Sequence, residues 1–198
     1  MAPIVYTPTV GFAAVNHHRL YRRPRGFYFS AVSFRFFSRI LGRWFFFSAR
    51  PKRFPLNKRN STRTNKKQDD VGEMDSMIWN CPSRDVEAIV ITDGSRILGL
   101  GDVGLNGLAI PQGKLDLYVA AGGFHPSRVL PIVLDVGCDN AELRSDPFYF
   151  GLKRRRIVGD DFFAIMDEVM RSLASRWPNC VIQFEDFSSD RASAILER

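Results

Sequence analysis

Long hydrophobic runs, cysteines and, in the first third of the chain, acidic residues are scarce in this 198-residue sequence. No stretch of about 18 uncharged apolar residues occurs, which excludes a predicted membrane-spanning helix. The 3 cysteines, Cys81, Cys138 and Cys180, are spaced for neither a zinc site nor a disulfide framework, so we expect reduced thiols of an intracellular protein. The length suits one domain, and a composition of 45% hydrophobic and 25% charged residues is that of a globular protein.

The missing acidic residues divide the chain in two. Residues 1–68 contain no Asp or Glu but 15 Lys and Arg, whereas residues 69–198 hold all 21 acidic residues and 13 basic ones. The net charge of +7 therefore hides a basic first part and an acidic second part. Such asymmetry is typical of a tail, a targeting segment or an insertion.

The segment 33–68 concentrates the anomaly, with 11 basic residues and 8 aromatic ones. Its arginines interrupt the apolar positions, so neither a helical nor a strand period is present, and its polar end predicts disorder. We interpret it first as an insertion foreign to the surrounding domain. The alternatives are a nucleic-acid patch of cations and stacking aromatics, which is the less favoured, and a transit-like sequence that lies inside the chain.

The second part of the chain alternates between strand and helix patterns. Apolar, β-branched runs predict strands over 86–92, 130–136 and 180–184. Pro111 and Gly122-Gly123 bracket a helix, and Asp160 and Asp161 are expected to cap another. The apolar face predicted for this second helix comprises Phe162, Ile165, Met166, Val169, Met170 and Leu173. This alternation predicts an α/β fold with a layer of parallel strands.

A glycine-rich stretch, Gly99-Leu-Gly-Asp-Val-Gly104, matches the spacing of a dinucleotide-binding fingerprint. Its context is poor, because the fingerprint should follow a strand directly and open a helix, whereas residues 93–98 intervene. We interpret it as a glycine-rich loop at which the backbone approaches a ligand. The basic run 153–156 is interpreted as a solvated loop face without a chemical role.

Four residues are candidates for chemistry. Glu185 and Asp186 end the third predicted strand, where ligands of open α/β sheets gather, and could bind Mg²⁺ or Mn²⁺ or form a solvated loop. Lys114 lies in the first turn of its helix, where the helix dipole and burial favour the neutral amine of a general base, although an exposed lysine is the simpler interpretation. Arg96 could bind a carboxylate with its planar guanidinium.

Taken together, several stretches resemble malic enzymes. They occur in family order and are residues 2–11, 21–31, 70–82, 92–102, 110–114, 134–137 and 183–187. The resemblance covers roughly residues 2–32 and 69–198. It implies an α/β fold in which a partial parallel-sheet layer and its helices are similar to the malic enzyme N-terminal (aminoacid-dehydrogenase-like) domain, interrupted by the disordered basic insertion.

The resemblance also implies a function. Malic enzymes oxidatively decarboxylate (S)-malate to pyruvate and CO₂ with NAD or NADP and Mg²⁺ or Mn²⁺, and assemble as homo-oligomers, dimers or tetramers. By this resemblance Tyr6 is the general acid, Lys114 the general base and Arg96 the arginine that contacts malate and the cofactor side. Glu185 and Asp186 are two of the three metal ligands. The compartment stays open among the mitochondrion, the cytoplasm and the plastid.

Departures from the family pattern lead to further expectations. We expect residues 1–32 to begin the malic enzyme N-terminal domain, residues 33–68 to be the insertion, and residues 69–198 to complete the domain. The third metal ligand and the NAD-binding domain are expected to be absent from the chain. The insertion resembles translated non-coding sequence, such as a retained intron. We therefore predict that these 198 residues alone are inactive, and a non-catalytic subunit that associates with full-length malic enzyme is the alternative.

Overall fold

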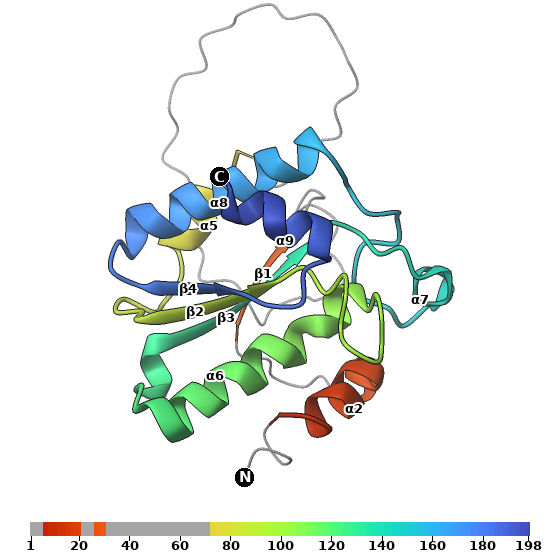
Figure 1. The fold of residues 1–198 in the computed structure, drawn as a ribbon, viewed down its shortest axis with the longest axis horizontal. Coiled ribbons are helices and arrows are strands. Elements are labelled where there is room, and N and C mark those ends of the chain that lie inside the picture. Colours follow the sequence, from red (N-terminus) through yellow and green to blue (C-terminus); the bar gives the residue numbers. More distant parts are fainter. Residues whose placement is uncertain (1–5, 21–25, 31–71) are drawn as a thin grey trace, which may run out of the picture.

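A parallel β-sheet between two layers of helices forms the centre of the protein in a computed structural model, which describes residues 6–20, 26–30 and 72–198 (Figure 1). The strands are β1 (Phe27–Ser30), β2 (Ala88–Thr92), β3 (Val129–Asp135) and β4 (Val181–Phe184), in the spatial order β1-β3-β2-β4. All three strand pairs are parallel. The expected α/β class with parallel strands is therefore confirmed.

The helices cover both faces of the sheet (Figure 1). On one face lie α5 (Met74–Trp79), α8 (Asp160–Arg176) and α9 (Ser189–Leu196), and on the other α2 (Thr9–Val15) and α6 (Ala109–Gly122). The shorter elements are α3 (His17–Leu20), α7 (Ala141–Ser145) and the 3₁₀ turns η1 (Gly104–Leu108) and η2 (Pro126–Arg128). None of the helices in the described ranges is long and apolar enough to cross a membrane.

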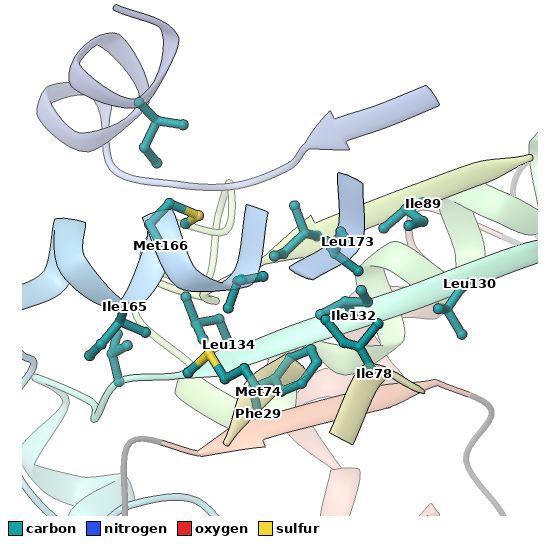
Figure 2. Close-up of a cluster of buried hydrophobic side chains, with 14 of the residues drawn as sticks. Phe29, Met74, Ile78, Ile89, Leu130, Ile132, Leu134, Ile165, Met166 and Leu173 are labelled. Atoms are coloured by element: carbon teal, nitrogen blue, oxygen red, sulfur yellow. The ribbon is translucent and has the colours of Figure 1, made fainter. Parts of the chain in front are cut away.

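The main core lies between the sheet and α5, α8 and α9 (Figure 2). Ile89, Ile132 and Leu134 point from the strands toward Met166 and Leu173 of α8, and all are almost fully buried. The apolar period of α8 is as predicted, with Met170 only partly buried at its edge. Burial of such side chains stabilises the fold by about 1.5–3 kcal/mol each, so this layer fixes where the strand ends lie.

Several local predictions need correction. The sequence pattern did not predict β1, a short edge strand of four residues. Helix α6 begins at Ala109, so Pro111 occupies its third position, where the missing N–H costs no hydrogen bond. The cap of α8 is Gly159, and Asp160 and Asp161 lie in the first turn, where the helix dipole still favours negative charge. The proposed insertion 33–68 lies outside the described residues.

Candidate functional site

The candidate residues meet at the carboxyl ends of β2 and β4. Glu185 and Asp186 follow β4, and the turn that carries Arg96 follows β2. The Glu185 N–H donates to the Ile91 carbonyl at 2.9 Å, so the strand ladder holds the two turns together. Lys114 is the sixth residue of α6, so the prediction that it lies in the first turn is wrong: the helix begins at Ala109, before Pro111, and Lys114 lies in the second turn. Tyr6 lies three residues before Thr9, the first residue of α2, which packs on α6.

Glu185 is the centre of this group. Its Oε1 accepts a hydrogen bond from the Tyr6 hydroxyl at 3.1 Å and forms an ion pair with Lys114 Nζ, also at 3.1 Å. Its Oε2 accepts from Gln183 Nε2 at 2.6 Å. The Glu185 and Lys114 side chains are only 15% and 23% exposed, so the ion pair is poorly screened by solvent. One carboxylate thus joins both predicted proton-transfer groups.

Asp186 occupies an unusual backbone conformation. With φ 56° it is the only non-glycine residue of the described ranges in the left-handed region, which Asp tolerates better than most residues. Its carbonyl accepts from the Arg96 N–H at 3.1 Å. Burial and the neighbouring Glu185 charge raise the pKa of Asp186 to about 6, against the opposing effect of Lys114. The turn therefore holds two carboxylates close together, an arrangement that favours binding of a proton or a cation.

Tyr6 is kept protonated by its surroundings. Burial, and then the negative charge and hydrogen bond of Glu185, raise the pKa of the Tyr6 phenol well above its ordinary value. Lys114 Nζ lies 5.2 Å from the centre of the Tyr6 ring. The Tyr6 phenol therefore retains its proton at neutral pH and has it available for donation.

Arg96 belongs to the same end of the sheet but makes different contacts. Its Nη1 donates to Ser189 Oγ at 2.6 Å, at the start of α9, and its exposed position leaves the guanidinium accessible to solvent. The adjacent Ser95 Oγ accepts from the Ser188 N–H at 2.9 Å. The arginine turn is thus attached to the segment that follows the two carboxylates.

The interpretation of the run 153–156 as a solvated face is wrong for Arg156. Arg156 Nε and Nη2 donate to the two carboxylate oxygens of Asp102 at 2.8 and 2.6 Å, and its side chain is 2% exposed. Arg156 Nη1 lies 3.4 Å from Asp93 Oδ2, which also pairs with Arg191 Nη1 at 2.7 Å. We call these four residues the buried ion network. Asp93 is buried and Asp102 is partly buried, so both carboxylates need cationic partners.

The glycine-rich stretch packs backbone against backbone. A β-carbon at Gly94 would lie 2.2 Å from the Gly104 carbonyl oxygen, so this contact requires glycine. Gly104 opens the 3₁₀ turn η1, not a helix joined directly to β2, which agrees with the poor fingerprint context. Asp102, within the stretch, accepts from the Asp139 N–H at 2.6 Å and from Cys138 Sγ at 3.3 Å. The loop is therefore attached to the segment after β3.

Two further site residues escaped the sequence interpretation. Gln183 is two positions before Glu185 on β4 and so shares its side of the strand, and Tyr118 is one helical turn after Lys114 on α6. The Tyr118 hydroxyl hydrogen-bonds to Gln183 Oε1. Strand alternation and helical spacing were signals that could have found both.

Oxygen donors for a divalent cation are present in part. Glu185 and Asp186 provide adjacent carboxylates, and Mg²⁺ is commonly held by one or two carboxylates completed by water and substrate oxygens. The described residues contain no cluster of three His, Cys, Asp or Glu side chains suited to a metal ion. The donor chemistry and the raised pKa of Asp186 fit such a cation, with two protein ligands from this part of the chain.

The fold and this site define an α/β domain with carboxylate, lysine and tyrosine side chains at the strand ends. Residues 49–198 match the family model described as malic enzyme, N-terminal domain. The chain belongs to the malic enzyme family. This confirms the family resemblance that the sequence motifs indicated.

The relatives extend well beyond the chain. It is 46% identical over 197 residues to NAD-dependent malic enzyme 1, mitochondrial, of Arabidopsis thaliana, covering 100% of this chain and 26% of the relative. Identity is 40% over 198 residues to the NAD-dependent malic enzyme of Cronobacter sakazakii (100% and 28%) and 41% over 196 residues to the hydrogenosomal malic enzyme of Neocallimastix frontalis (99% and 27%). The chain thus spans about a quarter of the length of these relatives.

Proposed function

We propose that the described residues form the malate-binding half of a malic enzyme site, which acts in oxidative decarboxylation of (S)-malate to pyruvate and CO₂. The observation that carries this proposal is the shared Glu185 oxygen, which places the Tyr6 hydroxyl and Lys114 Nζ each 3.1 Å away, beside Asp186. An acid and a base on one carboxylate oxygen can reach neighbouring carbons of one small substrate.

Each residue then has a role in proton transfer or binding. In its neutral amine form, which it must adopt by giving up a proton before the step, Lys114 Nζ takes the proton from the C2 hydroxyl of malate. After the C3–C4 bond breaks and CO₂ leaves, the bond electrons remain on an enolate, and the Tyr6 hydroxyl returns a proton to C3 to give pyruvate. Arg96 binds a malate carboxylate through its guanidinium, for which the exposed position beside Ser189 leaves access.

Two groups complete the chemistry in this proposal. Glu185 and Asp186 would hold Mg²⁺ or Mn²⁺, and the names of the relatives favour NAD over NADP. The cation would supply Lewis-acid polarisation of a substrate oxygen, and the nicotinamide would supply the acceptor for the C2 hydride. The same names favour a mitochondrial location.

Binding of malate tests the proposal without requiring turnover. With Mn²⁺ present, (S)-malate should bind the 198-residue chain in a calorimetric titration, and Arg96→Gln should remove the binding. Arg128→Gln is the matched control, because Arg128 is exposed and lies at the opposite end of the sheet. There its Nη1 pairs with Glu87 Oε1 at 2.5 Å. Equal malate affinity in the Arg96→Gln and wild-type chains would contradict the proposed role of Arg96.

We further propose that these 198 residues alone do not turn over malate. The alternative proposal is that they form a non-catalytic subunit that associates with longer malic enzyme subunits, which by the family resemblance form homo-oligomers. The first statement is supported by the length of the relatives, of which the chain spans about a quarter. Malate-dependent NAD(P) reduction by the purified chain would refute the first statement. Failure to co-purify at a fixed ratio with a full-length relative would refute the second.

A further inference from the structure

Glu185 is held from two directions. Gln183 lies on the same side of β4, and its Nε2 donates to Glu185 Oε2 at 2.6 Å. Tyr6 and Lys114 both bind the other oxygen, Oε1. Because a terminal carboxylate torsion is broad, contacts to one oxygen alone would let the carboxylate rotate. Gln183 is the contact that fixes the second oxygen.

Tyr118 determines which way the Gln183 amide faces. An ionised carboxylate only accepts hydrogen bonds, so the amide must present its NH₂ group to Glu185 and its carbonyl oxygen to Tyr118. The Tyr118 hydroxyl donates to that oxygen, and its ring stacks on Phe124 with centroids 6.0 Å apart. The stacked ring thus supports the amide, and the amide supports the carboxylate.

We infer that Gln183 and Tyr118 are positioning residues that hold the Glu185 carboxylate ready for a divalent cation. The inference rests on the proposed function, in which Glu185 is a metal ligand. Neither residue touches the substrate in this role: Gln183 acts through Glu185, and Tyr118 acts through Gln183. Hydrogen-bonding partners that orient a metal ligand commonly change metal affinity by about ten- to a hundredfold.

Uptake of Mn²⁺ measures this role directly. The electron paramagnetic resonance signal of free aqueous Mn²⁺ falls as the ion binds, so titration of the full chain gives an affinity without any turnover. Gln183→Leu should weaken Mn²⁺ binding about ten- to a hundredfold. Tyr118→Phe, which removes one hydrogen bond and keeps the stacked ring, should weaken it about two- to tenfold. Near-ultraviolet circular dichroism confirms that each variant is folded.

Two further variants separate positioning from general structure. Tyr28→Phe removes a comparable hydrogen bond, from the Tyr28 hydroxyl to Asp135 Oδ2 at 2.9 Å, and should leave Mn²⁺ affinity unchanged. The double variant Gln183→Leu with Tyr118→Phe should bind Mn²⁺ no more weakly than Gln183→Leu, because Tyr118 acts through Gln183. Should Gln183→Leu not fold, Tyr118→Phe beside Tyr28→Phe still decides the inference.

The outcomes distinguish this inference from the proposed function. The inference is overturned if folded Gln183→Leu binds Mn²⁺ with wild-type affinity. If Gln183→Leu does not fold, wild-type affinity in Tyr118→Phe overturns the inference. Additive losses of affinity in the double variant overturn the role of Tyr118. A wild-type chain that takes up no Mn²⁺ overturns the proposed metal site. In that case, nuclear magnetic resonance of the Gln183 side-chain amide tests the inference. A change in the chemical shift of this amide in the Glu185→Gln variant supports its hydrogen bond to the Glu185 carboxylate, and an unchanged chemical shift overturns the inference.

Discussion

Two charged clusters lie near the carboxyl ends of the strands, and they are balanced differently. In the buried ion network, Asp93 and Asp102 pair with two guanidinium groups, those of Arg156 and Arg191. At the candidate site, Glu185 and Asp186 share the single ammonium of Lys114. The first cluster is neutral by its ion pairs, whereas the second retains one negative charge. That difference separates a cluster that supports the fold from one suited to bind a cation.

The pKa directions agree with this contrast. Arg156, through hydrogen bonds and charge, lowers the pKa of Asp102 in spite of the opposing effect of burial. At the site, burial and the like charge of Glu185 act together and raise the pKa of Asp186 to about 6. The network therefore stabilises the charge of Asp102, whereas the surroundings of Asp186 disfavour its charge.

The largest expected effect is the loss of a cation from the buried ion network. Arg156→Met would remove the ion-pair partner of the partly buried Asp102 and one of the two partners of the buried Asp93, which should lower the free energy of unfolding by about 3–5 kcal/mol. Urea unfolding at pH 7 measures it. Arg155→Met is the matched control, because Arg155 is exposed, and should change stability by less than about 0.5 kcal/mol. Equal losses in both variants would remove the distinction between the clusters.

The pH dependence of stability should come partly from Asp102. Because its pKa is lower in the folded than in the unfolded chain, its contribution is complete above the unfolded value and is lost as pH falls through the folded value. The stability difference between wild type and Asp102→Asn should therefore narrow below the ordinary pKa of 3.8. Chemical unfolding at several pH values measures the free energy of unfolding of both proteins. A difference that stays constant as the pH falls below 3.8 would contradict the proposed contribution of Asp102.

Removing one tyrosine hydroxyl should cost more in the core than at the site. The Tyr149 hydroxyl accepts from the buried Leu105 N–H at 3.0 Å, so Tyr149→Phe leaves that donor unpaired and should cost about 1–3 kcal/mol. Tyr6→Phe leaves Glu185 with its partners Lys114 and Gln183, and should cost about 1 kcal/mol or less. Thermal unfolding of the two variants checks the order, and a reversed order would show that Tyr6 is needed for the fold.

The smallest expected effect is a gain in stability at the site. Asp186→Asn removes the charge that opposes Glu185 and keeps a side chain that tolerates a φ of 56°, so it should stabilise the fold by about 0.5–1 kcal/mol. Asp186→Ala removes the same charge but strains the left-handed backbone by about 1–2 kcal/mol. In urea unfolding, Asp186→Asn should have a higher free energy of unfolding than wild type, and Asp186→Ala a lower one than Asp186→Asn. A loss with Asn would mean that the carboxylate supports the fold.

The fold was more predictable than the contacts of the site. The apolar face of α8 and the three β-branched runs have strong local periods, and the structure contains each of them. The edge strand β1 has only four residues and no distinct alternation, so tertiary pairing with β3 decides it. Arg156 lies in a run of cations whose local pattern predicts solvation, and its ion pairs with Asp93 and Asp102 explain its burial.

The class of fold, the order of the later strands and helices, and the family motifs all follow from the amino-acid sequence without the structure. Periodicity and turn chemistry are local, so they can be interpreted without coordinates. The tertiary structure decided which side chains meet: Tyr6 reaches Glu185 across 179 positions, and Arg156 reaches Asp93 across 63. Packing of the helices on both faces of the sheet holds the parallel strands in place, so that their carboxyl ends lie at one edge. Side chains that are distant in the sequence meet at that edge, and no local sequence pattern predicts such contacts.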